Sequence, residues 1–122
     1  MDFSLTNEQK MIIDTLKTFV EQELYPHEME VEKTNQIRPE LAAQIKQKAL
    51  DLGLYAANMP EEHGGAGLDT LTLCLMEREL GRANFGLQYI VARPSNILLA
   101  CKGDQIENYL LASIRGDKVA CL

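Results

Sequence analysis

Apolar residues recur at three- and four-residue intervals along most of this chain, a spacing that places them on one face of an α-helix. The first such run spans residues 6–25, and Thr6 with Gln9 forms a capping box at its start. Pro26 is expected to end or kink this helix, because the residue before a proline avoids the right-handed helical region. A short acidic turn of helix is expected at 27–33.

The middle of the chain predicts a second helix followed by an apolar stretch. Pro39 suits the first position of this helix, and Gly53 suits the position just past its C-terminal end. Residues 54–59 are apolar and predict an extended segment.

Residues 59–67 contain Pro60 and three glycines, and they predict a fixed irregular loop rather than a floppy one. Asp69 is a good N-cap for the helix that follows. That helix is apolar on two sides, as is typical of a helix inside a bundle. Its apolar positions are Leu71, Leu73, Leu75, Met76 and Leu80.

The last third of the chain predicts two more helices. Asn84 caps a helix over 85–100, which Pro94 should kink or split because it removes one backbone hydrogen bond. Asp104 and Glu107 form a second capping box for a helix that Gly116 ends. Residues 119–122 resemble the first half of a strand whose partners are absent.

These elements predict an all-α fold, an antiparallel bundle of about five to six helices. Residues 1–117 are expected to form the helical domain; the family resemblance described below implies that residues 118–122 are the start of a β-domain that follows it. A helix content well over half is expected, with no sheet before Asp117.

Composition narrows the possible partners. The net charge is −6 without any basic stripe, so nucleic acid and anionic membranes are poor partners. No apolar run is long enough to cross a membrane, and the N-terminus lacks the features of a secretory leader. The three cysteines have no metal-binding spacing and predict reduced thiols, buried or at an edge, in a cytoplasmic protein.

Few residues combine into a chemical motif. The glycines before Asp69 resemble a phosphate-binding loop, but the acidic helix start competes with a phosphate, which favours a structural role. His27 and His63 have no partner at ligand spacing, so no metal site is expected. The two carboxylates of the Glu61–Glu62 pair do not face each other, and neither do those of the Glu77–Glu79 pair. Each pair is therefore expected to be solvated or salt-bridged rather than to act as an acid–base dyad.

Arg93 stands in an otherwise apolar segment, and an isolated arginine there needs an anionic partner or a route to water. A salt bridge to a nearby carboxylate is the favoured interpretation. The other is contact with an acidic group of a ligand or of another domain.

Four motifs occur in the same order as in a known family. They are F-x-L-T-x-E-Q at the start, the loop P-E-E-H-G-G-A-G-L-D, the helix end E-x-G-R-A, and G-D-Q-x-x-x-Y-L leading into R-G-D-K-V-A-C-L. Together they resemble the N-terminal helical domain of the acyl-CoA dehydrogenases. In that family the chain continues into a β-domain that contacts flavin, and a C-terminal helical domain supplies the catalytic carboxylate.

The resemblance implies a role in the α,β-dehydrogenation of an acyl-CoA thioester in fatty acid metabolism, in which a base takes the α-proton and FAD takes the β-hydride. This domain would supply one wall of the acyl pocket. By position, Gln88 and Ala92 would face the acyl chain, with Ser95 or Asn96 beyond them and Arg93 close by. Arg93 would then favour a polar or carboxylate-bearing acyl tail.

The resemblance assigns no catalytic, cofactor-binding or metal-binding residue to this chain. The partners it implies are an acyl-CoA, an electron-accepting flavoprotein and further copies of the enzyme. The 122 residues alone are expected to hold no FAD, to catalyse nothing and to self-associate. Two alternatives remain: a domain of a related flavin-dependent monooxygenase or acyl-CoA oxidase, and a stand-alone helical binding or scaffold module.

Overall fold

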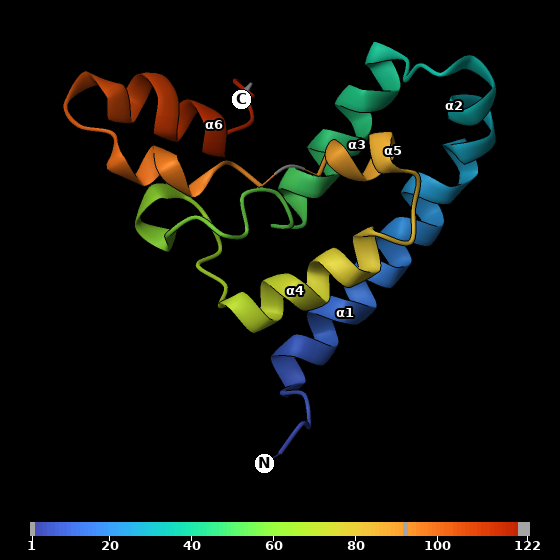
Figure 1. Ribbon diagram of the computed structural model, residues 1–122, viewed down its shortest axis with the longest axis horizontal. Helices are drawn as coiled ribbons and strands as arrows, with labels where there is room; N and C mark the ends of the chain where they lie inside the picture. The colour runs from blue at the N-terminus through green and yellow to red at the C-terminus, as the bar shows by residue number, and fades with distance from the viewer. Residues whose placement is uncertain (1, 92, 120–122) are drawn as a thin grey trace.

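The computed structural model describes residues 2–91 and 93–119, and 65% of these described residues are helical (Figure 1). The α-helices are α1 (Asn7–Phe19), α2 (Glu28–Thr34), α3 (Pro39–Asp51), α4 (Thr70–Leu80), α5 (Phe85–Tyr89) and α6 (Ala112–Ile114). Shorter 3₁₀ or π-helical segments are η1 (Val20–Leu24), η2 (Tyr25–His27), η3 (Glu61–His63), η4 (Asn96–Ala100) and η5 (Ile106–Leu111). The described residues contain no strand, so the predicted all-α class is confirmed.

The first helix begins as predicted but does not end at Pro26. The Thr6 hydroxyl accepts the Gln9 N–H at 3.1 Å, and the Gln9 side chain accepts the Thr6 N–H at 3.0 Å. Tyr25, which precedes the proline, keeps right-handed helical angles of φ −53° and ψ −41°. The expectation that this residue would avoid them was wrong. Instead, the hydrogen-bonding pattern changes through η1 and η2, which accommodates the missing proline N–H and leads directly into α2.

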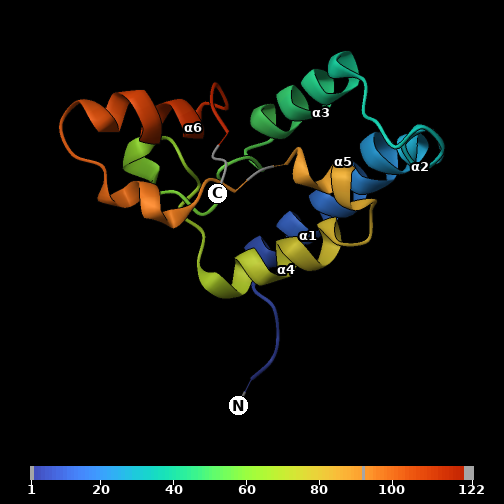
Figure 2. The ribbon, with the colours of Figure 1, turned by 45° about the horizontal axis from the view of Figure 1, so that its top comes forward.

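Helices α1 and α4 lie side by side and run in the same direction (Figures 1 and 2). Near their N-terminal ends the buried Gln9 side chain donates to the Thr72 hydroxyl at 3.2 Å. Near their C-terminal ends the charge of Lys17 acts on Glu79. This central pair is therefore parallel, although the bundle was expected to be antiparallel. The parallel arrangement is possible because α2, α3 and a long loop separate the two helices in sequence.

Glu79 is 4% exposed, which makes it the buried carboxylate of α4. Arg78 donates to it at 2.9 Å and Arg82 at 3.3 Å. Burial by itself raises the pKa of Glu79, but the hydrogen bonds from the two arginines outweigh burial and hold its pKa below the ordinary value. The carboxylate therefore stays ionised and satisfied, as the salt-bridged interpretation of this residue predicted.

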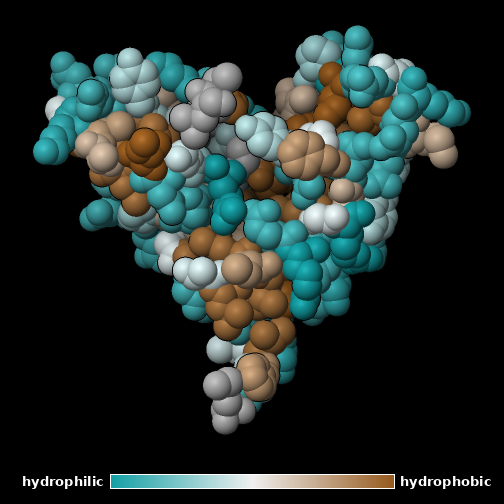
Figure 3. All heavy atoms as spheres, viewed as in Figure 1, coloured by the Kyte–Doolittle hydropathy of each residue, from teal (hydrophilic) through white to brown (hydrophobic). Residues whose placement is uncertain are grey.

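The apolar side chains of α4 are buried to different extents. Met76 and Leu80 pack in the core beside Thr72 and Glu79, whereas Leu71 is 57% exposed. Figure 3 shows apolar side chains gathered on the outer face over the N-terminal half of α4. Of the cysteines within the described residues, Cys101 is half-buried and Cys74 is exposed, so the expectation of buried or edge thiols fails for Cys74. The described helices are each too short or too polar to span a bilayer.

The apolar segment after α3 is buried, and it is a turn rather than the extended stretch that was expected. Ala56 adopts a left-handed φ of +55°, and residues 54–57 are all buried. The glycine loop then folds back on it: the Gly67 N–H donates to the Met59 carbonyl at 2.8 Å, and the Leu68 N–H donates to the Ala57 carbonyl at 3.0 Å. The prediction of a fixed irregular loop is therefore confirmed.

The C-terminal third agrees with its predicted form in one place and differs from it in another. The helix expected over 85–100 is split, as the presence of Pro94 predicted: α5 ends at Tyr89, and the chain becomes helical again only in η4, after Pro94. Asp104 and Glu107 form no capping box; the turn is closed by the Lys102 N–H, which donates to the Gln105 side chain at 3.2 Å. The strand expected at 119–122 lies outside the described residues except for Val119, which is in no regular element.

Replacing Gly65 should destabilise the loop far more than replacing Gly53. A Cβ at Gly65 would overlap the carbonyl of Met59, whereas a Cβ at Gly53 has open space and only the strain of a φ of +70°. We expect Gly65→Ala to lower the free energy of unfolding by about 3 kcal/mol or more, and Gly53→Ala by about 1 kcal/mol. Urea unfolding followed by circular dichroism measures both, and equal losses would contradict the packing described for the loop.

Candidate functional site

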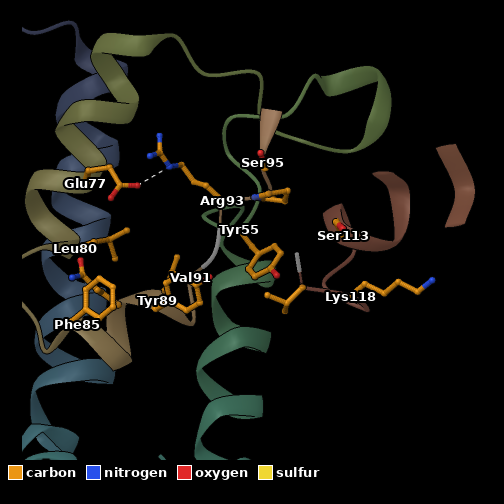
Figure 4. Close-up of a pocket in the computed structure, with 13 residues that line it drawn as sticks. Tyr55, Glu77, Leu80, Phe85, Tyr89, Val91, Arg93, Ser95, Ser113 and Lys118 are labelled. Carbon is orange, nitrogen blue, oxygen red and sulfur yellow. Dashed lines mark ion pairs between the residues drawn. The ribbon is translucent and has the colours of Figure 1, made fainter. Parts of the chain in front are cut away.

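A cavity of about 430 Å³ lies where α4, α5, the turn after α3 and the C-terminal end of α6 approach one another (Figure 4). Its apolar surface comes from Leu80 of α4, from Val91 and from three aromatic rings. Its polar groups are the side chains of Glu77, Gln88, Arg93, Ser95, Ser113 and Lys118. The volume is in the range typical of small-ligand pockets, roughly 300–1,000 Å³.

Helix α5 is held in place at its N-terminus by helix α2. Asn84 caps α5, since its side-chain oxygen accepts the Gly86 N–H at 2.9 Å. The backbone N–H of Asn84 donates to Glu28 at 2.7 Å, and its side-chain amide donates to Glu32. Leu87 on the inner side of α5 is fully buried. The predicted cap at Asn84 is therefore confirmed, and the contacts with α2 fix which side of α5 meets the cavity.

Three aromatic rings line this cavity. Phe85 and Tyr89 stand one turn apart on α5, with ring centroids 6.0 Å apart and planes tilted by 34°. Tyr55 lies on the opposite side of the cavity and is buried (Figure 4). Burial first, and the nearby Tyr89 second, raise the pKa of Tyr55, so its hydroxyl remains protonated at neutral pH.

Arg93 forms an ion pair across the cavity. Its Nε lies 2.8 Å from Oε1 of Glu77 on α4, and both side chains are about half exposed (Figure 4). The favoured interpretation of Arg93, a salt bridge to a nearby carboxylate, is therefore confirmed. A half-exposed pair of this kind contributes at most about 1 kcal/mol to stability.

Asn58 holds the irregular segment that follows α5. Its side-chain amide donates to the Pro94 carbonyl and to the Asn96 side chain, both at 2.8 Å. Its own side-chain oxygen is buried, and within the described residues it accepts no hydrogen bond. These contacts fix the backbone between Arg93 and Asn96, which has no regular secondary structure until η4 begins.

The remaining side of the cavity is attached to α3. The Lys46 ammonium donates to the Gly116 carbonyl and lies 5.9 Å from the centroid of the Tyr55 ring. Lys118 borders the cavity, but its ammonium donates to the Asn108 carbonyl at 2.8 Å, and Figure 4 shows its side chain directed away from the rings.

The structure brings together three of the four residues that the sequence predicted for an acyl-binding site. Gln88, Arg93 and Ser95 all line the cavity, whereas Ala92 lies outside the described residues. Asn96 is exposed and bonds to Asn58 instead.

Sequence reasoning missed the aromatic rings and Glu77. Phe85 and Tyr89 stand four residues apart, with Gln88 three residues after Phe85, so all three occupy one face of a helix. That spacing could have predicted that the two rings of α5 border the same site as Gln88. Nothing local to the sequence indicated that Tyr55 would lie opposite this face.

The other candidate chemistry finds no support in the geometry. The N–H groups of the glycine loop donate to its own carbonyls, those of Gly64 and Gly65 at 2.9 Å and 3.0 Å, so they are not directed at a phosphate. His63 lies 3.7 Å from Glu62. No cluster of three or more metal-ligating side chains occurs in the part of the chain that the structure describes. A second, more open groove of about 610 Å³ between α1 and α3 contains none of the predicted site residues.

Comparison with known proteins identifies the same family that the sequence motifs resemble. The family model for the acyl-CoA dehydrogenase N-terminal domain matches residues 6–117. The chain is 35% identical over 121 residues to a probable acyl-CoA dehydrogenase of Bacillus subtilis (strain 168), and the match covers 94% of this chain and 20% of that protein.

Two solved structures have a similar fold. A crystal structure of an acyl-CoA dehydrogenase complexed with FAD, from Bacillus anthracis, matches 94% of this chain and 20% of its own, with a TM-score of 0.75 and 26% identity. A structure of the electron transferring flavoprotein of Acidaminococcus fermentans matches 98% of this chain and 32% of its own, with a TM-score of 0.75 and 29% identity. The chain thus spans about a fifth to a third of the proteins that it matches.

Removing the side chain of Asn58 should loosen the wall of the cavity. We expect Asn58→Ala to lower the free energy of unfolding by about 1–2 kcal/mol, because two hydrogen bonds are lost, and to speed amide exchange in η4. The matched control is Asn108→Ala, whose side chain is exposed and makes no hydrogen bond within the described residues. Urea unfolding and hydrogen exchange measure both; unchanged exchange in η4 would contradict the anchoring role.

Proposed function

Because this chain belongs to the acyl-CoA dehydrogenase family, through the N-terminal domain of that family, we propose that it supplies one wall of an acyl-CoA pocket. The enzyme concerned would be an FAD-dependent dehydrogenase that oxidises the bond between the α- and β-carbons of the thioester. One observation carries the proposal. Gln88, Arg93 and Ser95, which the family resemblance assigned to the pocket, all line a single cavity.

The shape and lining of the cavity suit this role. Leu80, Tyr55 and Val91 are buried and form the apolar part of the lining, while six polar side chains share the rest of it. The apolar part suits an acyl chain, and polar groups in such a pocket fix the orientation of the ligand. Because Arg93 is already partnered by Glu77, we assign it to the polar rim of the pocket rather than to recognition of a charged tail.

The described residues are poorly suited to the chemical step itself. A general base near neutral pH needs a raised carboxylate pKa or a supported histidine. Glu77 is paired with Arg93, and the pKa of Glu79 is held below its usual value by Arg78 and Arg82. We therefore propose that this chain binds and orients the acyl group, and that the proton-accepting group belongs to another part of the enzyme.

FAD is the cofactor that the proposal requires, and the similar Bacillus anthracis structure is described as complexed with it. When bound, FAD would accept the hydride from the β-carbon. The described residues do not fit a flavin site, because the N–H groups of the glycine loop are used within the loop and Asp69 caps the next helix with its carboxylate. We derive no step through the flavin on this chain and expect the isolated chain to retain none on gel filtration.

Two further parts of the proposal concern partners. An electron-accepting flavoprotein would reoxidise the reduced flavin, and the similarity to the Acidaminococcus fermentans structure supports this choice. Self-association with further copies is the second part. The exposed apolar face of α4 around Leu71 supports an interface of some kind, since large apolar patches mark interaction sites.

A bulky side chain at Gln88 should block the pocket. In the enzyme that contains this domain together with its flavin-binding part, we expect Gln88→Trp to lower kcat/KM for acyl-CoA substrates by about tenfold or more, because the indole would occupy the space of the acyl group. Flavin content should not change. Dye-coupled assays measure the rate, and absorbance measures the flavin.

Gln44→Trp is the matched control, since Gln44 is exposed on α3 and does not line the cavity. Equal activity of the two variants would show that Gln88 does not border the acyl group, and the proposed role of the wall would then be wrong.

A further inference from the structure

Aromatic side chains are concentrated at this one cavity. The chain has three phenylalanines, four tyrosines and no tryptophan. Three of these seven rings, Tyr55, Phe85 and Tyr89, line the cavity, and they come from two separate segments of the chain. Figure 4 shows Tyr55 and Tyr89 facing the same space, with Phe85 beside Tyr89.

Two of the rings are not needed to hold the fold together. Phe85 is 74% exposed and Tyr89 is 60% exposed, so neither contributes much to the core. Leu87, which is fully buried, anchors α5 to the bundle instead. The exposed aromatic surface on α5 is therefore available to a ligand, and large rings held on a fixed helix lose little entropy when they bind.

The charged groups of the cavity are already engaged. Arg93 pairs with Glu77, and the ammonium of Lys118 donates to the Asn108 carbonyl. Both cations therefore already have a partner within this domain.

We propose that the acyl group bound by this wall carries an aromatic ring, so that the substrate class is an arylalkanoyl-CoA thioester rather than a straight-chain acyl-CoA. This inference rests on the proposed function. Aromatic rings prefer tilted or offset contacts with centroids roughly 4.5–7 Å apart. The pair formed by Phe85 and Tyr89, at 6.0 Å and 34°, already has that geometry, and both rings are more than half exposed.

The cavity has room for such a group. A cavity of about 150 Å³ accommodates benzene in a protein interior. The cavity here, at about 430 Å³, is large enough for a ring and the short chain that joins it to the thioester. Gln88, Ser95 and Ser113 supply polar groups at its border that can meet the carbonyl end of the acyl group.

The test compares 4-phenylbutanoyl-CoA with 4-cyclohexylbutanoyl-CoA, which have the same number of carbon atoms and whose rings are not attached to the reacting β-carbon. In the flavin-containing enzyme that includes this domain, dehydrogenation is followed by reduction of an artificial electron acceptor. We expect kcat/KM to favour the phenyl substrate by about three- to tenfold, the range that an aromatic contact contributes. Phe85→Leu and Tyr89→Leu should each reduce this ratio towards one, and Tyr89→Phe should retain it.

Phe3→Leu is the control, because Phe3 is an exposed ring outside the cavity. The ratio of kcat/KM for the phenyl and cyclohexyl substrates should be the same in this variant as in the unaltered enzyme. Circular dichroism of each variant shows that the helices are intact. A ratio near one in the unaltered enzyme, or a ratio that Tyr89→Leu leaves unchanged, would overturn the inference.

The outcomes also separate this inference from the proposed function. Turnover of straight-chain acyl-CoA with no preference for the phenyl substrate would leave the proposed function standing and refute the aromatic specificity. Failure to turn over any acyl-CoA would refute the proposed function and this inference with it.

Discussion

The packing of α4 against α1 is the constraint on which the rest of this domain depends. The two helices run in parallel, with the Gln9–Thr72 hydrogen bond near one end and the buried carboxylate of Glu79 near the other. Met76 and Leu80, on the same helix, are buried in the core. Because α5 follows α4 after a short turn, and because Glu77 and Leu80 border the cavity, the position of α4 also determines where the wall of the cavity stands.

The sequence predicted the parts of this fold that depend on neighbouring residues. The caps at Thr6, Asp69 and Asn84 are confirmed, and each rests on a side chain that meets a backbone N–H two or three residues away. Gly53 and Gly116 have the left-handed φ values expected at helix ends. Local stereochemistry is sufficient for such features.

Long-range contacts explain what the sequence did not predict. Gln9 and Thr72 are 63 positions apart, so no local pattern shows that they pair or that α1 and α4 are parallel. The salt bridges of Glu79 with Arg78 and Arg82 are local, but its burial depends on how α4 packs in the bundle, which the sequence around it does not show. The same limit applies to the site. Gln88, Arg93 and Ser95 were predicted from the family resemblance, whereas Tyr55 joins them only because the turn after α3 folds back towards α5.

The central claim is that the segment from Phe85 to Ser95 borders the acyl group of a bound thioester. The most direct test is a crystal structure of the flavin-containing enzyme with an acyl-CoA analogue that cannot be oxidised. We expect acyl carbon atoms within about 4.5 Å of Gln88 and Tyr89, the distance at which side chains are in contact. An acyl group that lies away from this segment, with the cavity filled by solvent or by another part of the protein, would contradict the account.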